Sequence, residues 1–206
     1  MDTPHGPAKA HLHPADGPQA ALVLGHGAAG GIAARDLVAV TAVAREQGLT
    51  VALVEQPYLV AGRRSAPRPP QLDAAWLAVV DRLRAAELEG LALVAGGRSL
   101  GARVACRTAA ATGADAVLCL AFPLRPPRRS KDTPSRLDEL DAVSVPTLVV
   151  QGDRDPFGMP PGGPRRTVVE VPGDHSLRKD LDAVAAAVRA WLPGVVAGAV
   201  GISAPG

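Results

Sequence analysis

Aromatic residues are scarce in this sequence, and their scarcity limits what its basic segments can bind. The 206 residues include two Trp, one Tyr and two Phe, together 2% of the chain. Two basic, proline-rich segments, Arg63–Arg64 and Arg125 to Lys131, contain no aromatic residue on which a base could stack. The net charge is only +2. We therefore expect no nucleic-acid partner and interpret both segments as solvated loops.

Cysteines and long apolar runs are also scarce. Cys106 and Cys119 lie in apolar segments outside any ligand spacing, which predicts small buried side chains in a reducing compartment. No run reaches the roughly 18 apolar residues of a membrane helix, and the N-terminal segment lacks the apolar core of a signal peptide. His5, His11 and His13 precede the first expected strand without carboxylates at ligand spacing. We expect a cytoplasmic protein with no membrane partner and no metal.

Short apolar segments alternate with longer segments of helical periodicity. This alternation predicts an α/β fold, a mainly parallel sheet with helices on both faces, in one domain over residues 1–206. Residues 1–18 are expected to form an arm or edge strand, with pairing near 8–13, and residues 193–206 a loosely held tail. The six main strands are expected at 20–25, 50–55, 91–96, 115–121, 146–151 and 166–171. The helices are expected at 34–47, 71–86, 100–112, 135–142 and 177–192.

The segment LVLGHGAAGG, which ends the first main strand, supports two interpretations. Gly25, Gly27 and Gly30 fit the G-x-G-x-x-G spacing of a dinucleotide-binding loop. Glu55 ends the next strand, where an acidic residue would meet a ribose hydroxyl. A His-Gly pair after a strand is also how many hydrolases begin an oxyanion-binding turn, here at His26. The segment alone does not decide between them.

A G-x-S-x-G sequence around Ser99 lies between an expected strand and an expected helix. A serine at such a turn stands above the sheet in strained backbone geometry, and the small flanking residues avoid collisions with neighbouring elements. The N-terminus of the following helix directs free N–H groups toward negative charge on a substrate. Ser99 is therefore a candidate nucleophile.

A serine nucleophile needs a histidine base and an acid that orients it. The segment TLVVQGDRDPFG carries Asp153 and Asp155 after an apolar strand, and VVEVPGDHSLRK carries His175 after the next strand. The order Ser99, Asp155, His175 is that of α/β-hydrolases. We favour Asp155 over Asp153 as the acid, because Pro156 restricts the backbone of Asp155 to extended conformations.

The first loop would complete this site if it lies beside the loop that carries Ser99. Ligands of open parallel sheets gather where the strand order reverses, which would bring the two loops together. The backbone N–H groups of Leu100 and Ala28 would then form an oxyanion hole. The dinucleotide interpretation leaves Ser99, Asp155 and His175 unexplained.

The chain resembles a small member of the α/β-hydrolase superfamily, near the dienelactone-hydrolase-like proteins. More closely, it is similar to the hydrolase-like domain that bacterial proteins share with the testis-expressed and non-specific-lethal complex subunit families. The motifs that carry the resemblance are LVLGHGAAGG, VALVEQPYLVAGRR, GGRSLGAR, LAFPL, LVVQGDRDPFG and PGDHS. It implies a compact α/β-hydrolase fold with Ser99 as nucleophile, Asp155 as acid and His175 as base. Because some relatives serve as interaction modules, a non-catalytic protein-binding role is the alternative.

The expected pocket is open and shallow, because the insertion after the strand at 115–121 is too short for a substantial lid. Arg98 either favours an acidic substrate or extends into solvent. We expect a serine hydrolase that cleaves small soluble esters or thioesters through an acyl-enzyme, without a cofactor. A protein partner or a homo-oligomer is left open. The candidate substrate-binding residues are His26, Gly27, Tyr58, Arg98, Phe122, Phe157 and Met159.

Overall fold

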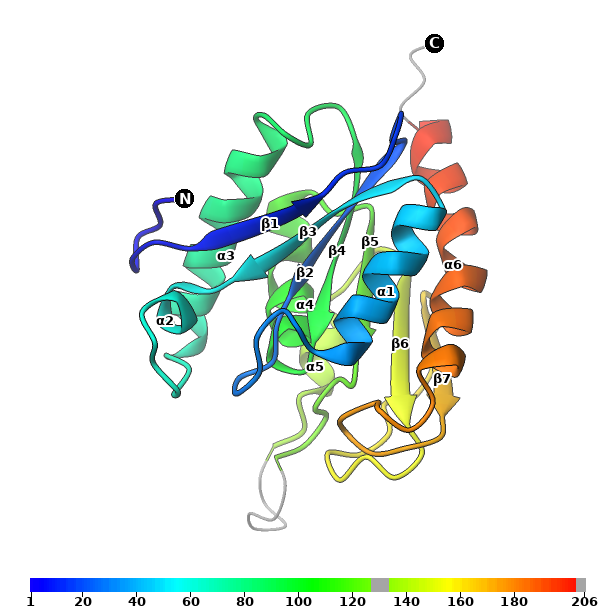
Figure 1. The fold of residues 1–206 in the computed structure, drawn as a ribbon. Helices are drawn as coiled ribbons and strands as arrows, with labels where there is room; N and C mark the ends of the chain where they lie inside the picture. Colours follow the sequence, from blue (N-terminus) through cyan, green and yellow to red (C-terminus); the bar gives the residue numbers. More distant parts are fainter. Residues whose placement is uncertain (127–133, 203–206) are drawn as a thin grey trace.

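One sheet forms the centre of the molecule. The computed structural model describes residues 1–126 and 134–202. Seven strands lie in the order β1-β3-β2-β4-β5-β6-β7, and all neighbours are parallel except β1, which pairs antiparallel with β3 (Figure 1). The strands are β1 (Lys9–His13), β2 (Ala20–Gly25), β3 (Leu49–Glu55), β4 (Ala92–Arg98), β5 (Ala116–Leu120), β6 (Thr147–Gly152) and β7 (Arg166–Val171). This confirms the predicted α/β class, with β1 as the expected edge strand.

The apolar runs account for the strand positions. Every residue of β2, β5 and β6 is buried, as is typical of parallel strands covered by helices on both faces. The bounds of all seven strands agree with the predicted ranges to within two residues.

Helices cover both faces of the sheet. On one face α1 (Arg35–Glu46) and α6 (Leu181–Ile202) pack side by side, and on the other α3 (Pro69–Arg84) packs beside α4 (Leu100–Thr112) (Figure 1). Alternate residues of β2 point to opposite faces of the sheet. Leu22 and Leu24 pack in the α1/α6 core, and Ala21 and Val23 pack in the α3/α4 core. The two short helices are α2 (Pro57–Val60), which the sequence did not predict, and α5 (Leu137–Asp141).

The C-terminal segment differs from its prediction. Helix α6 continues through Pro193 to Ile202, whereas a loosely held tail was expected from residue 193. Leu192 and Val195 are buried in the α1/α6 layer, and this packing extends the helix. Pro193 has no N–H for the carbonyl of Arg189, and the side-chain amide of Gln47 donates to that carbonyl instead, at 2.8 Å. Residues 203–206 of the predicted tail lie outside the described residues, as do 127–131 of the second basic segment.

By length and composition alone, one stretch of α6 is apolar enough to cross a membrane. It comprises Leu181–Gly198, with a mean hydropathy of 1.3. The sequence prediction had found no such run. In the structure 22% of this stretch is buried, and Val184, Val188 and Leu192 form its fully buried face in the α1/α6 layer.

Candidate active site

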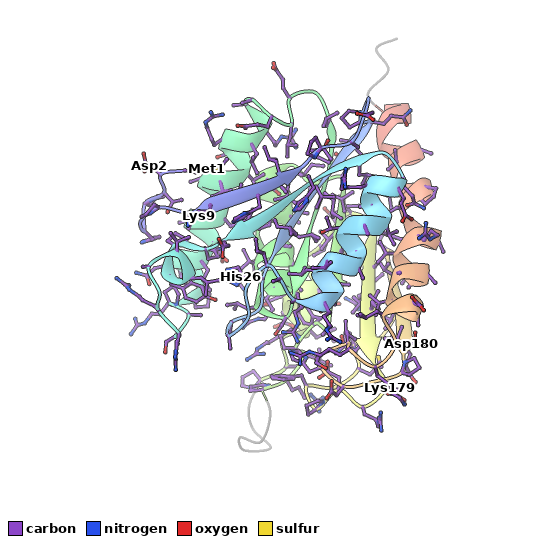
Figure 2. All side chains as sticks on the ribbon, in the orientation of Figure 1. Met1, Asp2, Lys9, His26, Lys179 and Asp180 are labelled. Carbon is purple, nitrogen blue, oxygen red and sulfur yellow. The ribbon has the colours of Figure 1, made fainter. Side chains whose placement is uncertain are left out.

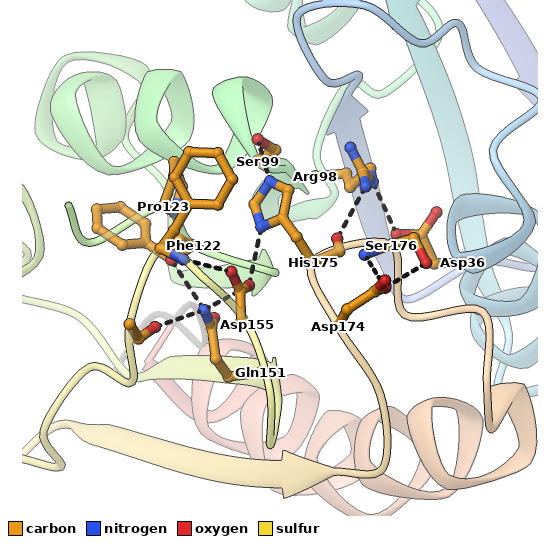
Figure 3. Close-up of polar contacts among 12 residues, drawn as sticks. Asp36, Arg98, Ser99, Phe122, Pro123, Gln151, Asp155, Asp174, His175 and Ser176 are labelled. Carbon is orange, nitrogen blue, oxygen red and sulfur yellow. Dashed lines mark hydrogen bonds and ion pairs between the residues drawn. The ribbon is translucent and has the colours of Figure 1, made fainter. Parts of the chain in front are cut away.

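Three side chains that the sequence singled out meet above the carboxyl ends of the strands. Ser99 directly follows β4, Asp155 follows β6 and His175 follows β7. The Nε2 atom of His175 lies 2.9 Å from Oγ of Ser99, and its Nδ1 atom lies 2.8 Å from Oδ2 of Asp155 (Figure 3). The structure therefore joins these three side chains into one hydrogen-bonded chain.

Ser99 stands at a sharp turn between β4 and α4. Its backbone has φ 52° and ψ −106°, a region that non-glycine residues rarely adopt, and its N–H donates to the carbonyl of Leu120 at 2.8 Å. The flanking glycines are needed because β2 passes close behind the turn. A Cβ atom at Gly97 would lie 2.6 Å from the carbonyl oxygen of Gly25, and one at Gly101 would also collide with Gly25. This packing explains why residue 25 is a glycine, and a pyrophosphate-binding role is not needed to explain it.

Asp155 is fixed by three donors in a nearly closed site. Its side chain is 1% exposed. Besides the imidazole of His175, the side-chain amide of Gln151 donates to Oδ2 at 2.8 Å, and the N–H of Phe157 donates to Oδ1 at 2.9 Å. Asp153, in contrast, accepts from the N–H of Gly173 at 2.7 Å and has a side chain that is 38% exposed. Asp155 therefore contacts the imidazole of His175, whereas Asp153 bonds the backbone of the loop that carries His175.

His26 holds the loop that follows β2 (Figure 2). It is buried, and its Nε2 atom accepts from the N–H of Gln56 at 3.1 Å. Because that N–H can only donate, the proton of the neutral ring is on Nδ1, which donates to the carbonyl of Gly27 at 2.8 Å. Burial lowers the pKa of His26, which favours this neutral form. Both ring nitrogens are therefore used within the protein and not toward a substrate.

Tyr58 supports the same loop from α2. Its hydroxyl donates to the carbonyl of Ala28 at 3.1 Å, and burial raises its pKa to about 12, so the donor proton is retained at neutral pH. The loop in turn faces the serine, since a Cβ atom at Gly27 would lie 3.7 Å from Cβ of Ser99. Among the described residues, no acceptor takes a hydrogen bond from the N–H of Ala28 or of Leu100. These two donors are available on either side of Ser99.

The other predicted substrate-binding residues have different surroundings. The ring of Phe157 packs on the imidazole of His175, with centroids 4.1 Å apart and planes at 36°. Met159 is exposed. Phe122 is fully buried in the α3/α4 core, which does not fit its predicted place in an open pocket, because the apolar segment after β5 turns inward.

Arg98 has internal partners. Its Nε atom donates to Oδ2 of Asp36 at 3.2 Å and its Nη2 atom to the carbonyl oxygen of His175 at 2.8 Å (Figure 3). Of the two alternatives for Arg98, extension into solvent is wrong, since these partners hold the side chain against the protein and leave it 18% exposed.

Three residues that support the site were not predicted from the sequence: Asp36, Gln56 and Gln151. An acidic residue in the first turn of a helix is common, so Asp36 carried no distinctive signal. Gln56 and Gln151 are polar residues at the ends of apolar strands, in LVEQP and LVVQG. For Gln151 the available signal was the burial of its amide, which demands hydrogen-bond partners. Gln56 bonds His26 through its backbone N–H, which no side-chain pattern indicates.

The described residues contain no group of three or more His, Cys, Asp or Glu side chains that could hold a metal ion. The third glycine of the G-x-G-x-x-G pattern, Gly30, has open space around it, and α1 begins only at Arg35. The helix N-terminus is thus not adjacent to the pattern, as a pyrophosphate site requires.

Known proteins share this fold. Dienelactone hydrolase from Anabaena variabilis superimposes with a TM-score of 0.74 at 18% identity, covering 94% of both chains. A serine hydrolase without a lid from Xanthomonas campestris gives 0.72 at 22% identity, covering 94% of this chain and 93% of that one. Est1E from Butyrivibrio proteoclasticus, solved with ferulic acid bound, gives 0.73 at 19% identity, covering 92% and 96%.

Comparison of sequences identifies the family of the chain. No curated protein matches the chain. The model of the family described as the alpha/beta hydrolase domain matches residues 18–179, most of the chain. The chain therefore belongs to the alpha/beta hydrolase domain family.

Proposed function

We propose that this protein is a serine hydrolase that cleaves small soluble esters or thioesters through an acyl-enzyme on Ser99. The observation that carries the proposal is the hydrogen-bonded chain from Ser99 through His175 to Asp155. A serine hydroxyl is a weak nucleophile at neutral pH, and a histidine at hydrogen-bond distance supplies the base that activates it. The strained backbone of Ser99 also favours a catalytic role, because such strain clusters at active sites.

Each side chain has a defined role in the first half of the reaction. Nε2 of His175 takes the proton of Ser99 while Oγ attacks the carbonyl carbon of the substrate. The carboxylate of Asp155 holds the proton on Nδ1 and stabilises the imidazolium that forms. The N–H groups of Ala28 and Leu100 bind the negative oxygen of the tetrahedral intermediate. The intermediate collapses to the acyl-enzyme, and His175 gives its proton to the departing alcohol or thiol.

Hydrolysis of the acyl-enzyme repeats these steps with water. His175 takes a proton from the water, the hydroxide attacks the acyl carbon, and Ser99 leaves with the proton returned by the imidazole. The product is a free carboxylic acid. The ferulic acid bound to Est1E is a free carboxylic acid, which supports an ester of a small carboxylic acid as the substrate class here.

A fluorophosphonate probe tests the proposal directly, because it phosphonylates only an activated serine. We expect the native protein to be labelled and Ser99→Ala to remain unlabelled. Ser176→Ala is the matched control, since this half-buried serine beside His175 bonds only to Asp174 within its own turn, and it should label like the native protein. A series of 4-nitrophenyl esters of increasing acyl length should give turnover that is lost in Ser99→Ala. Absence of labelling, under conditions where a control esterase reacts, would remove the proposal.

The alternative function is protein binding without catalysis, and it follows from the resemblance to the complex-subunit families. If the chain is close to the testis-expressed and non-specific-lethal complex subunit families, it can serve as a protein-interaction module. A binding module has no chemical need for an aligned Ser99, His175 and Asp155, and for this reason we favour catalysis. A protein partner that is retained equally by native protein and Ser99→Ala, together with absent turnover, would favour the module.

A further inference from the structure

Arg98 connects three loops of the site. It is the last residue of β4 and is bonded covalently to Ser99. Its Nε atom donates to Asp36 in the first turn of α1, and its Nη2 atom donates to the carbonyl of His175 in the loop after β7. The loop after β2 lies against it as well, since a Cβ atom at Gly27 would lie 2.8 Å from Nη1. One side chain thus joins the serine, the histidine backbone and the first loop (Figure 3).

Asp36 fixes the direction of the Arg98 side chain. Its carboxylate is 1% exposed, and Oδ1 accepts from the N–H of Leu37 at 2.9 Å, which leaves Oδ2 for the guanidinium. Burial raises the pKa of Asp36, and the positive charge of Arg98 opposes this rise and favours the ionised carboxylate. A guanidinium is planar and presents several donors at fixed angles, so anchoring Nε also orients Nη2 toward His175.

The turn that carries His175 is held from outside at its start, where the N–H of Gly173 donates to Oδ1 of Asp153 at 2.7 Å and the carbonyl of Gly173 accepts from the N–H of Arg154 at 2.9 Å. The N–H of Leu177 donates to the carbonyl of Asp174 at 3.1 Å, and Oδ1 of Asp174 accepts from the N–H of Ser176 at 2.9 Å. These bonds lie within the turn and fix its shape. The buried side chain of Leu177 anchors its far end. The bond from Arg98 is what attaches the peptide of His175 to the strand that presents Ser99.

We propose that Arg98 is a positioning residue that keeps His175 aligned with Ser99, and that Asp36 holds Arg98 in the required direction. The kinetic part of this inference rests on the proposed hydrolase function. Arg98 acts here through the backbone of His175 and not on the substrate. Its loss therefore lowers kcat and leaves KM unchanged, equally for neutral and anionic esters.

The double variant Arg98→Met/Asp36→Asn removes the bond to His175 without leaving a buried charge that has lost its partner. It should therefore fold with a Tm close to that of the native protein. We expect kcat to fall about 10- to 100-fold, since a misplacement of about 1 Å in a catalytic group costs on the order of 10²-fold. Arg98→Lys should give a kcat between those of the native protein and the double variant, because an ammonium group does not reproduce the fixed angles of the Nε and Nη2 donors.

The matched control is Arg107→Met/Asp73→Asn. It removes another arginine–aspartate pair, in which Nε of Arg107 donates to Oδ2 of Asp73 at 2.8 Å between α3 and α4. The two arginines are similarly exposed, while Asp73 is more exposed than Asp36. Because this pair bonds no loop of the site, kcat should match that of the native protein.

A crystal structure of Arg98→Met/Asp36→Asn gives a readout that does not depend on turnover. We expect the distance between Oγ of Ser99 and Nε2 of His175 to increase from 2.9 Å beyond about 3.5 Å, outside hydrogen-bond range. An unchanged distance with native kcat would overturn the positioning role. A rise in KM confined to anionic esters would also overturn it, and would make Arg98 a substrate-binding residue. An inactive native protein would remove the proposed function, while the distance would still decide the role of Arg98.

Discussion

Gln151 donates a hydrogen bond at 2.8 Å to Oδ2 of Asp155, the same oxygen that lies 2.8 Å from Nδ1 of His175. Gln151 belongs to β6 and is fully buried. Its Nε2 atom also lies 3.1 Å from the carbonyl of Phe122 and 2.9 Å from that of Gly158. The carboxylate that orients the imidazole is therefore itself oriented from a strand of the sheet, which is more rigid than the loop on which Asp155 lies.

Replacement of Gln151 tests this support. The two N–H groups of the Gln151 amide are shared by three acceptors, the carboxylate of Asp155 and the carbonyls of Phe122 and Gly158. In Gln151→Leu all three lose this donor. Of the two carbonyls, only that of Phe122 keeps another donor among the described residues, the N–H of Leu124, so the free energy of unfolding should fall by about 1–3 kcal/mol. We expect kcat to fall with it, while KM changes little. Urea unfolding and steady-state kinetics measure the two effects. A second variant, Gln151→Glu, places a like charge beside Asp155 and should be less stable than Gln151→Leu at neutral pH. Native kcat in Gln151→Leu would contradict the proposed support.

The two aspartates after β6 should differ sharply in their effect on turnover. Asp155→Asn keeps the shape of the side chain but favours the wrong imidazole tautomer, and a loss on the order of 10⁴ in kcat is expected by analogy with the serine-protease precedent. Asp153→Asn weakens the acceptor for the N–H of Gly173 and removes an exposed ion pair with Arg154, neither of which contacts His175, and it should leave kcat close to native. Steady-state turnover of both variants decides the assignment. The reverse order of effects would show that Asp153 is the acid.

The sequence predicted the fold and the three aligned side chains because both depend on local patterns. Buried parallel strands are continuous apolar runs, and their carboxyl ends converge, so Ser99, Asp155 and His175 could be grouped without coordinates. The direction of a long side chain is different, since it depends on partners distant in sequence. Arg98 contacts Asp36, which lies 62 positions away, and nothing in GGRSLGAR indicates that partner. The end of α6 was mispredicted for the same reason, because Gln47 accommodates Pro193 from another helix.

The glycines of the serine turn should be intolerant of a side chain. A Cβ atom at Gly101 would meet the backbone of Gly25, and neither backbone can move without separating β2 from α4. Gly101→Ala should therefore lower the free energy of unfolding by about 1–3 kcal/mol or more, as overpacking of a tight contact does. Gly30→Ala is the control, because nothing lies within 4 Å of the added Cβ and stability should be unchanged. Thermal unfolding compares the two. Equal Tm values for both variants would contradict the packing account of these glycines.

The free energy of unfolding should decrease as the pH falls, because of His26 in the loop after β2. Burial lowers the pKa of His26 below its usual 6.5, so in the window just below pH 6.5 the unfolded chain binds a proton that the folded chain does not. The contribution of His26 to stability is complete above pH 6.5 and decreases below it, by at most about 1.4 kcal/mol per pH unit.

His26→Gln isolates this effect, because glutamine does not titrate. The variant should be less stable than the native protein at pH 7.5, since the hydrogen bonds to Gly27 and Gln56 are altered, and the difference should shrink toward pH 5.5. Asp36, whose pKa is raised by burial, gives a slope of the opposite sign, but it is present in both proteins and cancels in the comparison. Urea unfolding of both proteins at several pH values measures the difference. A difference that stays constant with pH would mean that His26 does not lose its proton on folding, and that its ring is not the neutral clamp between Gly27 and Gln56.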